Sequence, residues 1–268
     1  MKRRACCWPA KQPATMPAAD PIAPRGRADQ MLVQLGHAES RERARQMIAE
    51  QAVRADGRIV DKPARLINAD SQIEIASQLV GWVSRAALKL QAGLDQFSQC
   101  DPAGKICLDL GASTGGFSQL LLQRGARRVY AVDVGSGQLH SDLQGFAGLV
   151  SLEKTDARQL TAALIPEAPQ LITADLSFIS LQLALGPSLG LAAPQCQLLV
   201  LVKPQFELGP KHLAKGGIVR DAAARQQAVA RIADWLAEHG WQPRGVIESP
   251  LAGRGGNQEY LLAAEKAS

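Results

Sequence analysis

The chain has 268 residues, of which 46% are hydrophobic and 21% are charged, and its formal net charge at neutral pH is +5. The most apolar stretch, residues 181–202, is interrupted by Pro187, Pro194, Gln195 and Gln197, so the sequence predicts no membrane-spanning helix. The five cysteines show neither a CxxC spacing nor a histidine cluster, which indicates free thiols in a reducing cytoplasm and no metal site.

The first 26 residues are predicted to form a disordered leader. Prolines and scattered alanines follow the basic start, where a secretory signal would need a continuous apolar stretch. The next segment is also basic, because residues 25–65 hold 9 basic and 6 acidic side chains, whereas residues 66–268 hold 17 and 18. Such a surplus favours polyanion binding through counterion release, although a solvated charged surface has the same composition.

Residues 27–77 are predicted to form a small α+β domain. A helix over residues 27–36 ends at Gly36, and Ser40 is placed to cap a second helix over residues 41–48. Three short β segments are expected after the helices, at residues 52–54, 58–60 and 72–76.

The sequence of this segment is similar to that of a known RNA-binding domain. RADQML at 27–32, SRERARQMI at 40–48 and VRADGRIV at 53–60 resemble the domain shared by ribosomal protein S4, tyrosyl-tRNA synthetases and some pseudouridine synthases. The resemblance implies that the second helix and the following turn bind RNA phosphates and grooves. By position, this role is assigned to Arg41, Arg45, Arg54, Arg58 and Lys62.

After a linker over residues 78–83, residues 84–268 are predicted to form an α/β domain. Ser84 is expected to cap a helix that begins at residue 85. Apolar strand-like runs then alternate with helical ones, which is typical of a Rossmann-like, mainly parallel sheet. The seven expected strands are residues 106–110, 128–132, 149–153, 171–174, 197–202, 242–248 and 259–263.

The first of these strands leads into a glycine-rich turn, CLDLGASTGGF, that predicts a cofactor site. It lacks the GxGxxG spacing of a dinucleotide site, and its acidic residue would repel a phosphate, so S-adenosylmethionine is the better fit. Asp109 is expected near the methionyl ammonium, and Asp133, at the end of the second strand, near the ribose hydroxyls. The remaining candidates are Gly111, Ser113 and Gly115 in the turn and Asp156, which contacts the adenine or merely caps a helix.

Two further strand ends carry reactive side chains, Asp175 and Lys203. The sequence DLSF at 175–178 differs from the Asp/Asn-Pro-Pro-aromatic motif of amino-group methylases, and Cys196 lies at the wrong end of its strand to act as a nucleophile. Together with Lys89 and Glu259, these side chains form a Lys-Asp-Lys-Glu order. A solvent-facing lysine or an edge-strand glutamate without a catalytic role would give the same sequence, so the alternative that these residues are not catalytic stays open at this point.

The order Lys89, Asp175, Lys203, Glu259 is that of the tetrad in ribose methyltransferases of the FtsJ type. Because a 2′-hydroxyl is a very weak acid, its attack on a sulfonium methyl needs a base. Lys203 is the expected base and Asp175 its positioning residue. Burial and the neighbouring Lys89 are expected to favour the unprotonated amine of Lys203.

The motifs SRAALKL, DLGASTGGF, RVYAVDVG, ADLSFISL, LVKPQFE and KGGIVRD resemble the TlyA hemolysin and FtsJ-like ribosomal RNA methyltransferase family. The resemblance covers nearly the whole chain after residue 26. It implies 2′-O-methylation of cytidine in ribosomal RNA, with ribosomal subunits as partners and the tetrad as the catalytic residues. One departure is SRAALK at 84–89, where the family usually has two glycines in place of the alanines. A membrane-lytic hemolysin and a non-catalytic ribosome-binding factor are the alternatives.

Overall fold

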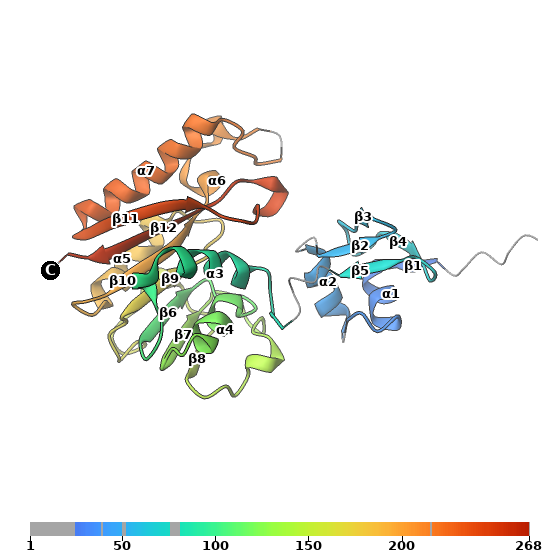
Figure 1. The fold of residues 1–268 in the computed structure, drawn as a ribbon, viewed down its shortest axis with the longest axis horizontal. Helices are drawn as coiled ribbons and strands as arrows, with labels where there is room; N and C mark the ends of the chain where they lie inside the picture. The colour runs from blue at the N-terminus through green and yellow to red at the C-terminus, as the bar shows by residue number, and fades with distance from the viewer. Residues whose placement is uncertain (1–24, 39, 50–51, 76–80, 215, 268) are drawn as a thin grey trace, which may run out of the picture. The chain divides into compact units, whose positions relative to one another are not determined.

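The computed structural model describes residues 25–38, 40–49, 52–75, 81–214 and 216–267 (Figure 1). The chain divides into two compact units, Met1–Glu74 and Ile75–Ser268. Residues 1–24 of the predicted leader and residues 78–80 of the predicted linker lie outside the described residues, so the expected domain boundaries stay predictions. Within the described ranges, no helix combines the length and the apolar character that a membrane span requires.

The first unit contains two helices and short strands, as the sequence predicts. Its elements are β1 (Arg25–Arg27), α1 (Ala28–Gln34), α2 (Arg41–Ala49), β2 (Val53–Ala55), β3 (Arg58–Ile59), β4 (Leu66–Asn68) and β5 (Ile73–Ile75). The strands form a three-stranded sheet in the order β3-β2-β5 and a two-stranded sheet, β1-β4. Neither β1 nor β4 was expected, and Arg25 and Gly26 belong to β1 instead of the leader.

Local chemistry explains where α2 begins and which side of it is buried. The backbone N–H of Arg43 donates to Ser40 Oγ at 3.1 Å, so Ser40 caps α2 as predicted. Buried Ala44, Met47 and Ile48 lie on one side of α2, which confirms the predicted apolar side of this helix.

The second unit is built on a seven-stranded sheet, which confirms the predicted fold class. The strand order is β11-β12-β10-β9-β6-β7-β8, and β12 runs antiparallel to both of its neighbours, β10 and β11. The strands are β6 (Ile106–Leu110), β7 (Arg128–Val132), β8 (Leu149–Leu152), β9 (Leu171–Ala174), β10 (Gln197–Val202), β11 (Trp241–Glu248) and β12 (Tyr260–Lys266). The helices are α3 (Ala86–Gln96), α4 (Gly116–Gln123), α5 (Leu181–Leu191), α6 (Pro204–Glu207) and α7 (Ala222–Glu238).

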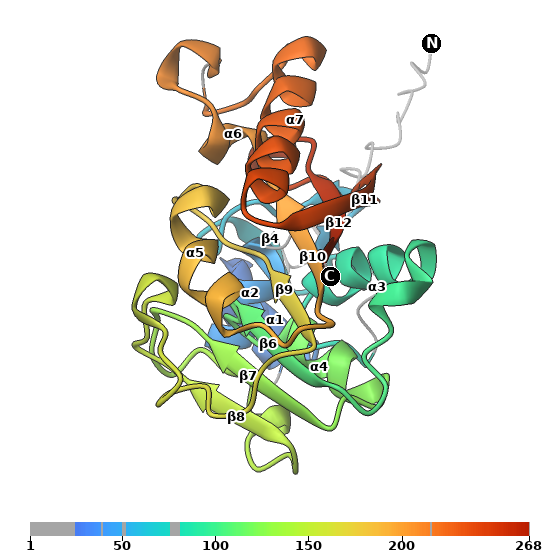
Figure 2. The same ribbon diagram turned by 90° about the vertical axis from the view of Figure 1, so that its left-hand side faces the viewer.

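Helices cover both faces of this sheet. Side chains of α3 and α4 pack into one apolar cluster with the sheet, and side chains of α5 and α7 pack into another cluster. Figure 2 shows α5 on one side of the central strands and α3 and α4 on the other. Nearly every side chain of β6, β9 and β10 is therefore buried, as continuous apolar strands in a doubly wound sheet require.

The predicted cap of α3 is wrong. The N-cap position is Arg85, which makes no side-chain cap hydrogen bond, and Ser84 is buried. Ser84 packs so closely on the start of α4 that a Cβ atom at Gly116 would lie 2.2 Å from its Oγ. Tertiary packing between α3 and α4 thus takes precedence over the local capping preference of serine.

Candidate active site

Four of the strands end at one edge of the sheet and place the residues that follow them side by side. Parallel pairing aligns Leu110 with Val132 and with Ala174, so the turns after β6, β7 and β9 share this edge. Because β12 is antiparallel to β10, its first residue, Tyr260, pairs with Val202 at the end of β10. Residues just before β12 therefore lie at the same edge.

Lys203 and Asp175 form an ion pair at this edge. Lys203 Nζ lies 2.6 Å from Asp175 Oδ1 and donates to Ser177 Oγ at 2.9 Å. Only 7% of Lys203 is exposed, so it is not the solvent-facing lysine that the sequence alone left open. Burial raises the pKa of Asp175, but the ammonium groups of Lys203 and Lys89 outweigh burial and hold that pKa below its usual value.

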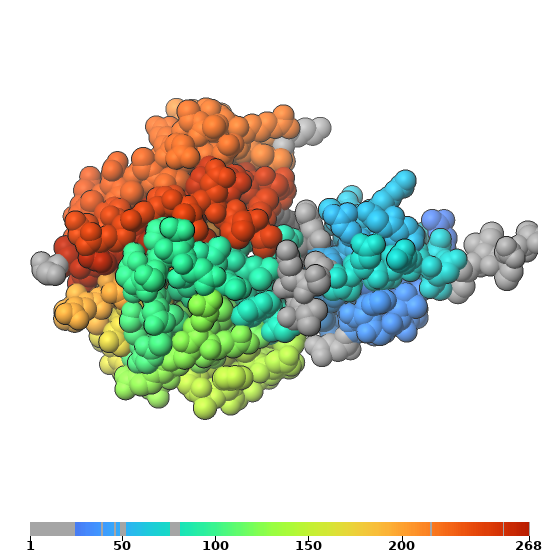
Figure 3. All heavy atoms as spheres, in the orientation of Figure 1, coloured from blue at the N-terminus to red at the C-terminus, as the bar shows by residue number. Residues whose placement is uncertain are grey.

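Lys89 and Glu259 form a second ion pair. Lys89 Nζ donates to Glu259 Oε2 at 2.7 Å, and the side chains are 13% and 2% exposed. Their elements, α3 and the strands at the C-terminal end of the chain, lie side by side on one face of this unit (Figure 3). The structure therefore brings together the four residues that the sequence analysis selected.

Three neighbours of these pairs were not predicted. Ser177 is the second partner of Lys203, and a Cβ atom at Gly253 would lie 1.8 Å from Glu259 Oε1. Phe178 is 80% exposed, has a left-handed φ of 66° and contacts the ring of Phe206 at a centroid distance of 5.2 Å. A bulky residue in this conformation is rare outside turns and functional sites. Ser177 and Phe178 belong to the DLSF sequence at 175–178, but only the fold shows what they contact.

The glycine-rich turn lies directly against Asp175. A Cβ atom at Gly111, whose φ is 79°, would lie 2.7 Å from the carbonyl oxygen of Asp175, so a larger residue would not fit. Ser113 also has a left-handed φ, of 48°, and is exposed, and Gly115 is the N-cap of α4. The turn therefore brings backbone close to the tetrad.

Asp133 and Asp156 follow the neighbouring strands of the same edge. Asp133 is half-buried, and its two carboxylate oxygens accept from the backbone N–H groups of Ser113 and Gly135 at 2.8 and 2.7 Å. Each oxygen keeps a further lone pair for a hydroxyl donor. Asp156 accepts from the N–H of Arg158 at 2.9 Å, so it caps a short helix, as the alternative interpretation expected.

Asp109 lies inside the sheet and has no exposed surface. Its carboxylate accepts from Ser118 Oγ at 2.6 Å and from Thr173 Oγ1 at 3.1 Å, and burial raises its pKa to about 7. In this conformation it ties β6 to α4 and β9. Contact with a methionyl ammonium therefore stays a prediction for Asp109.

The predicted RNA-binding residues all lie in the first unit. Arg41 and Arg45 form ion pairs with the buried Asp29, and Arg54 donates to the carbonyl of Gly57 at 3.0 Å. Arg58, on β3, and Lys62 are exposed. Bonds from Arg27, Arg41 and Arg45 together hold the pKa of Asp29 well below its usual range.

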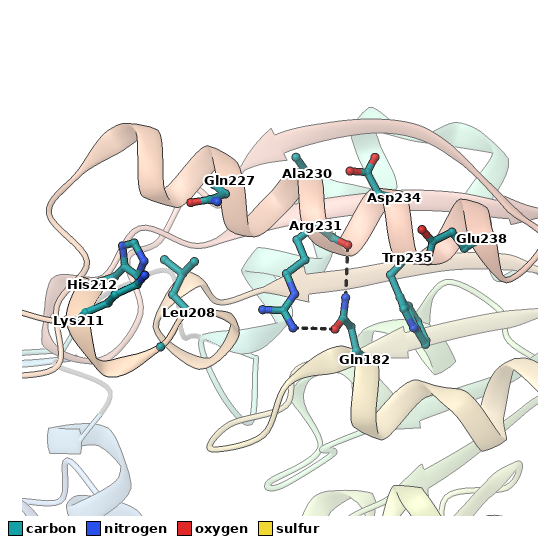
Figure 4. A pocket seen from close by; sticks show the side chains of 11 residues that line it. Gln182, Leu208, Lys211, His212, Gln227, Ala230, Arg231, Asp234, Trp235 and Glu238 are labelled. Carbon is teal, nitrogen blue, oxygen red and sulfur yellow. Dashed lines mark hydrogen bonds between the residues drawn. The ribbon is translucent and has the colours of Figure 1, made fainter.

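A separate open groove of about 570 Å³ lies along α7 (Figure 4). Gln182 on α5 and Arg231 on α7 form two hydrogen bonds there, of 3.1 and 3.4 Å. Lys211 and His212 lie toward one end and Asp234 toward the other. Its lining includes none of the predicted catalytic or cofactor residues, so it is distinct from the site at the sheet edge.

Across the described part of the chain, no cluster of three or more His, Cys, Asp or Glu side chains has the arrangement of a metal site.

Known proteins share this architecture. A 16S/23S rRNA (cytidine-2′-O)-methyltransferase of Mycobacterium tuberculosis, TlyA, is 43% identical over 242 residues, which cover 90% of each chain. Hemolysin A of Brachyspira hyodysenteriae is 35% identical over 88% of this chain and 98% of its own length. A solved structure of a proposed hemolysin from Streptococcus thermophilus has a TM-score of 0.73 and 33% identity, covering 91% of this chain and 90% of that one.

Two family models divide the chain in the same way as its structure. The model of the S4 domain matches residues 26–73, and the model of the FtsJ-like methyltransferase matches residues 82–266. The second match spans well over half of the chain and contains both ion pairs and the glycine-rich turn. The chain belongs to the FtsJ-like methyltransferase family and carries an S4 domain before its methyltransferase domain.

Proposed function

We propose that this protein transfers a methyl group from S-adenosylmethionine to a ribose 2′-hydroxyl of ribosomal RNA, with cytidine as the target nucleoside. The proposal is based on two largely buried ion pairs beside the glycine-rich turn, one between Lys203 and Asp175 and the other between Lys89 and Glu259. The name of the 43% identical relative supports the choice of ribosomal RNA and of cytidine.

The residues at the sheet edge fit S-adenosylmethionine. Gly111 allows close approach of backbone, and Ser113 and Gly115 complete the turn that would hold the amino-acid part. Asp133 presents a half-buried carboxylate with free lone pairs for the two ribose hydroxyls, and Asp156 lies near the end of the third strand for the adenine. When bound, this cofactor supplies an electrophilic methyl group on a sulfonium centre.

The four charged residues would then prepare the attacking hydroxyl. Lys203 is the proposed base: after its ammonium has given up a proton, its amine accepts the proton of the 2′-hydroxyl, which leaves the oxygen nucleophilic. Asp175 and Ser177 fix the position of that amine through their contacts of 2.6 and 2.9 Å. Lys89, held by Glu259, places a positive charge beside the oxygen as negative charge develops on it.

Phe178 and the basic residues of the first unit would hold the RNA. The exposed Phe178 ring lies three residues after Asp175 and offers a face on which a base near the target ribose stacks, a contact worth about 1–3 kcal/mol per base. Arg41, Arg45, Arg54, Arg58 and Lys62 would bind phosphates. Action on ribosomal RNA places the protein in the cytoplasm with the ribosome.

A non-catalytic ribosome-binding factor is the weaker interpretation. Removing most of the surface of two lysines and two carboxylates from water costs desolvation energy, and a scaffold has no use for that arrangement at a cofactor edge. Phe178, which follows Ser177 directly and is exposed with a left-handed φ, supports the same conclusion.

The test is transfer of labelled methyl from S-adenosylmethionine to unmodified 30S and 50S subunits. We expect the label in 2′-O-methylcytidine, and a loss of about 100-fold or more in rate for Lys203→Ala with cofactor binding retained. Lys105→Ala, at the opposite edge of the sheet, is the control and should act as the wild type does. Absence of transfer to either subunit, while S-adenosylmethionine still binds, would refute ribosomal RNA as the substrate. Label on a base instead of the ribose would refute the proposed chemistry.

A further inference from the structure

Three arginines of the first unit converge on one buried carboxylate. Asp29 has no exposed surface, and it accepts from Arg27 Nε at 3.0 Å, from Arg41 at 2.9 Å and from Arg45 Nε at 3.2 Å. Arg27 directly precedes α1, Asp29 lies in the first turn of α1, and Arg41 and Arg45 lie one turn apart on α2. The carboxylate thus joins three positions of the chain.

The carboxylate itself is held in place by its backbone. The N–H groups of Ala28 and Asp29 donate to the carbonyls of Arg65 and Pro63 at 2.8 and 3.1 Å. This anchors the start of α1 on the loop that follows Lys62. The position of the carboxylate is therefore set by the fold and not by the arginines.

The arginines remain available to a ligand. Their side chains are 41%, 49% and 54% exposed, whereas the Asp29 side chain is 0% exposed. A guanidinium has five N–H donors, and the bonds to Asp29 use two from Arg27 and one each from Arg41 and Arg45. One negative charge among three positive ones leaves a net positive group with most of its donors free for other acceptors.

We propose that Asp29 is a positioning residue for RNA binding: it holds the guanidinium groups of Arg27, Arg41 and Arg45 together as one preformed site for RNA phosphates. Three guanidiniums this close repel one another, and their long side chains would otherwise sample many rotamers. The buried carboxylate offsets the repulsion and removes that freedom before RNA arrives, which lowers the cost of binding. The proposal rests on the proposed action on RNA, and it adds Arg27 and Asp29 to the residues concerned.

The direction in which RNA affinity changes in Asp29→Asn separates a positioning role of Asp29 from a simple effect of its charge. Asp29→Asn removes a negative charge from a protein that binds a polyanion, so charge alone predicts tighter binding and a steeper salt dependence. Positioning predicts the reverse, about tenfold weaker binding of the full-length protein to a labelled 23S ribosomal RNA transcript. Asp70→Asn makes the same charge change at an exposed position of the same unit, and it should bind as tightly as the wild type or slightly more tightly.

A second variant covers the case in which Asp29→Asn unfolds the first unit, as judged by circular dichroism. The double variant Arg27→Lys with Arg41→Lys keeps all charges and Asp29, but loses the planar donors that Asp29 and phosphates share. Positioning predicts that it too binds more weakly than the wild type. If Asp29→Asn folds and binds RNA with wild-type affinity, the inference is overturned. If Asp29→Asn is unfolded, wild-type affinity of the double lysine variant overturns it. Neither result would affect methyl transfer by the wild type. Failure of the proposed function would appear separately, as absence of methyl transfer by the wild-type protein.

Discussion

Lys89 Nζ lies 2.7 Å from Glu259 Oε2, although 170 residues separate the two positions in the chain. Lys89 is on the helix that precedes the first strand of the sheet, and Glu259 directly precedes the last strand. Because that strand runs antiparallel to β10, its beginning lies at the edge where the parallel strands end. The reversed strand thus brings a carboxylate from the C-terminal end of the chain to the edge that carries the candidate active site.

Breaking this pair should reduce stability and activity in separable ways. Glu259→Gln leaves the nearly buried ammonium of Lys89 without its counter-charge, which should lower the free energy of unfolding by about 3 kcal/mol. Lys89→Met together with Glu259→Gln removes both charges and should recover most of that stability. The rate of methyl transfer should stay low in both proteins, because the single variant no longer holds the Lys89 ammonium in place and the double variant has no positive charge at this position.

The measurements are urea unfolding and single-turnover methyl transfer to ribosomal subunits. Asp95→Asn, which breaks an exposed ion pair with Arg124, is the control and should change stability by less than about 1 kcal/mol. If the double variant regained activity as well as stability, Lys89 and Glu259 would have only a structural role.

Gly253→Ala should impair methyl transfer through Glu259 alone. The backbone at Gly253 has φ −75°, which alanine tolerates, but its Cβ would lie 1.8 Å from Glu259 Oε1. The buried carboxylate would have to move and lengthen its bond to Lys89. We expect kcat to fall by about tenfold or more with KM for subunits little changed. Gly209→Ala, whose Cβ would meet no atom within 4 Å, is the matched control and should retain wild-type rates.

Phe178→Ala should weaken productive RNA binding. The ring is 80% exposed and follows directly after Ser177, which contacts Lys203, so its loss removes a stacking surface but little of the hydrophobic core. A loss of about 1–3 kcal/mol in stacking corresponds to roughly 5- to 150-fold in kcat/KM. Phe178→Trp should retain activity, because it keeps an aromatic face. Phe146→Ala removes another exposed ring, in the loop before β8, and should leave kcat/KM unchanged. Equal losses for both alanine variants would rule out a specific role for Phe178.

Much of the second unit could be predicted from the sequence because its strands are buried on both faces. Continuous apolar runs such as Ile106–Leu110 and Gln197–Val202 have few alternative structures, and both strands have the predicted bounds. The Lys-Asp-Lys-Glu order was informative for a related reason. Residues that follow parallel strands meet at one edge, so their order in the chain is enough to place Asp175 and Lys203 together.

The remaining features depend on contacts between distant segments. β1 and β4 are three residues each and stabilise one another by pairing, so neither has a recognisable pattern of its own. Ser84 has the sequence signature of a cap but packs on Gly116 instead. The bond between Ser177 and Lys203 likewise follows from tertiary structure, since 26 positions separate them. No local spacing rule contains this information.

Asp109 should make the stability of the second unit depend on pH. Its folded-state pKa, about 7, lies above the ordinary value of 3.8 because the carboxyl group is buried, so the folded chain holds this proton more tightly than the unfolded chain. The resulting stabilisation is complete below about pH 4 and is lost as the pH rises through about 7. One pKa unit corresponds to about 1.4 kcal/mol, so the loss amounts to roughly 4 kcal/mol.

Asp109→Asn removes this titration while keeping the shape of the side chain. The free energy of unfolding of the wild type, minus that of the variant, should therefore fall by a few kcal/mol between pH 5 and pH 8. Urea unfolding followed by tryptophan fluorescence measures it, because three of the four tryptophans, including the buried Trp241, lie in the second unit. Asp234→Asn, at an exposed position, corrects for the loss of one negative charge. A difference that stayed constant over this range would show that Asp109 is ionised in the folded protein throughout, held as a carboxylate by Ser118 and Thr173.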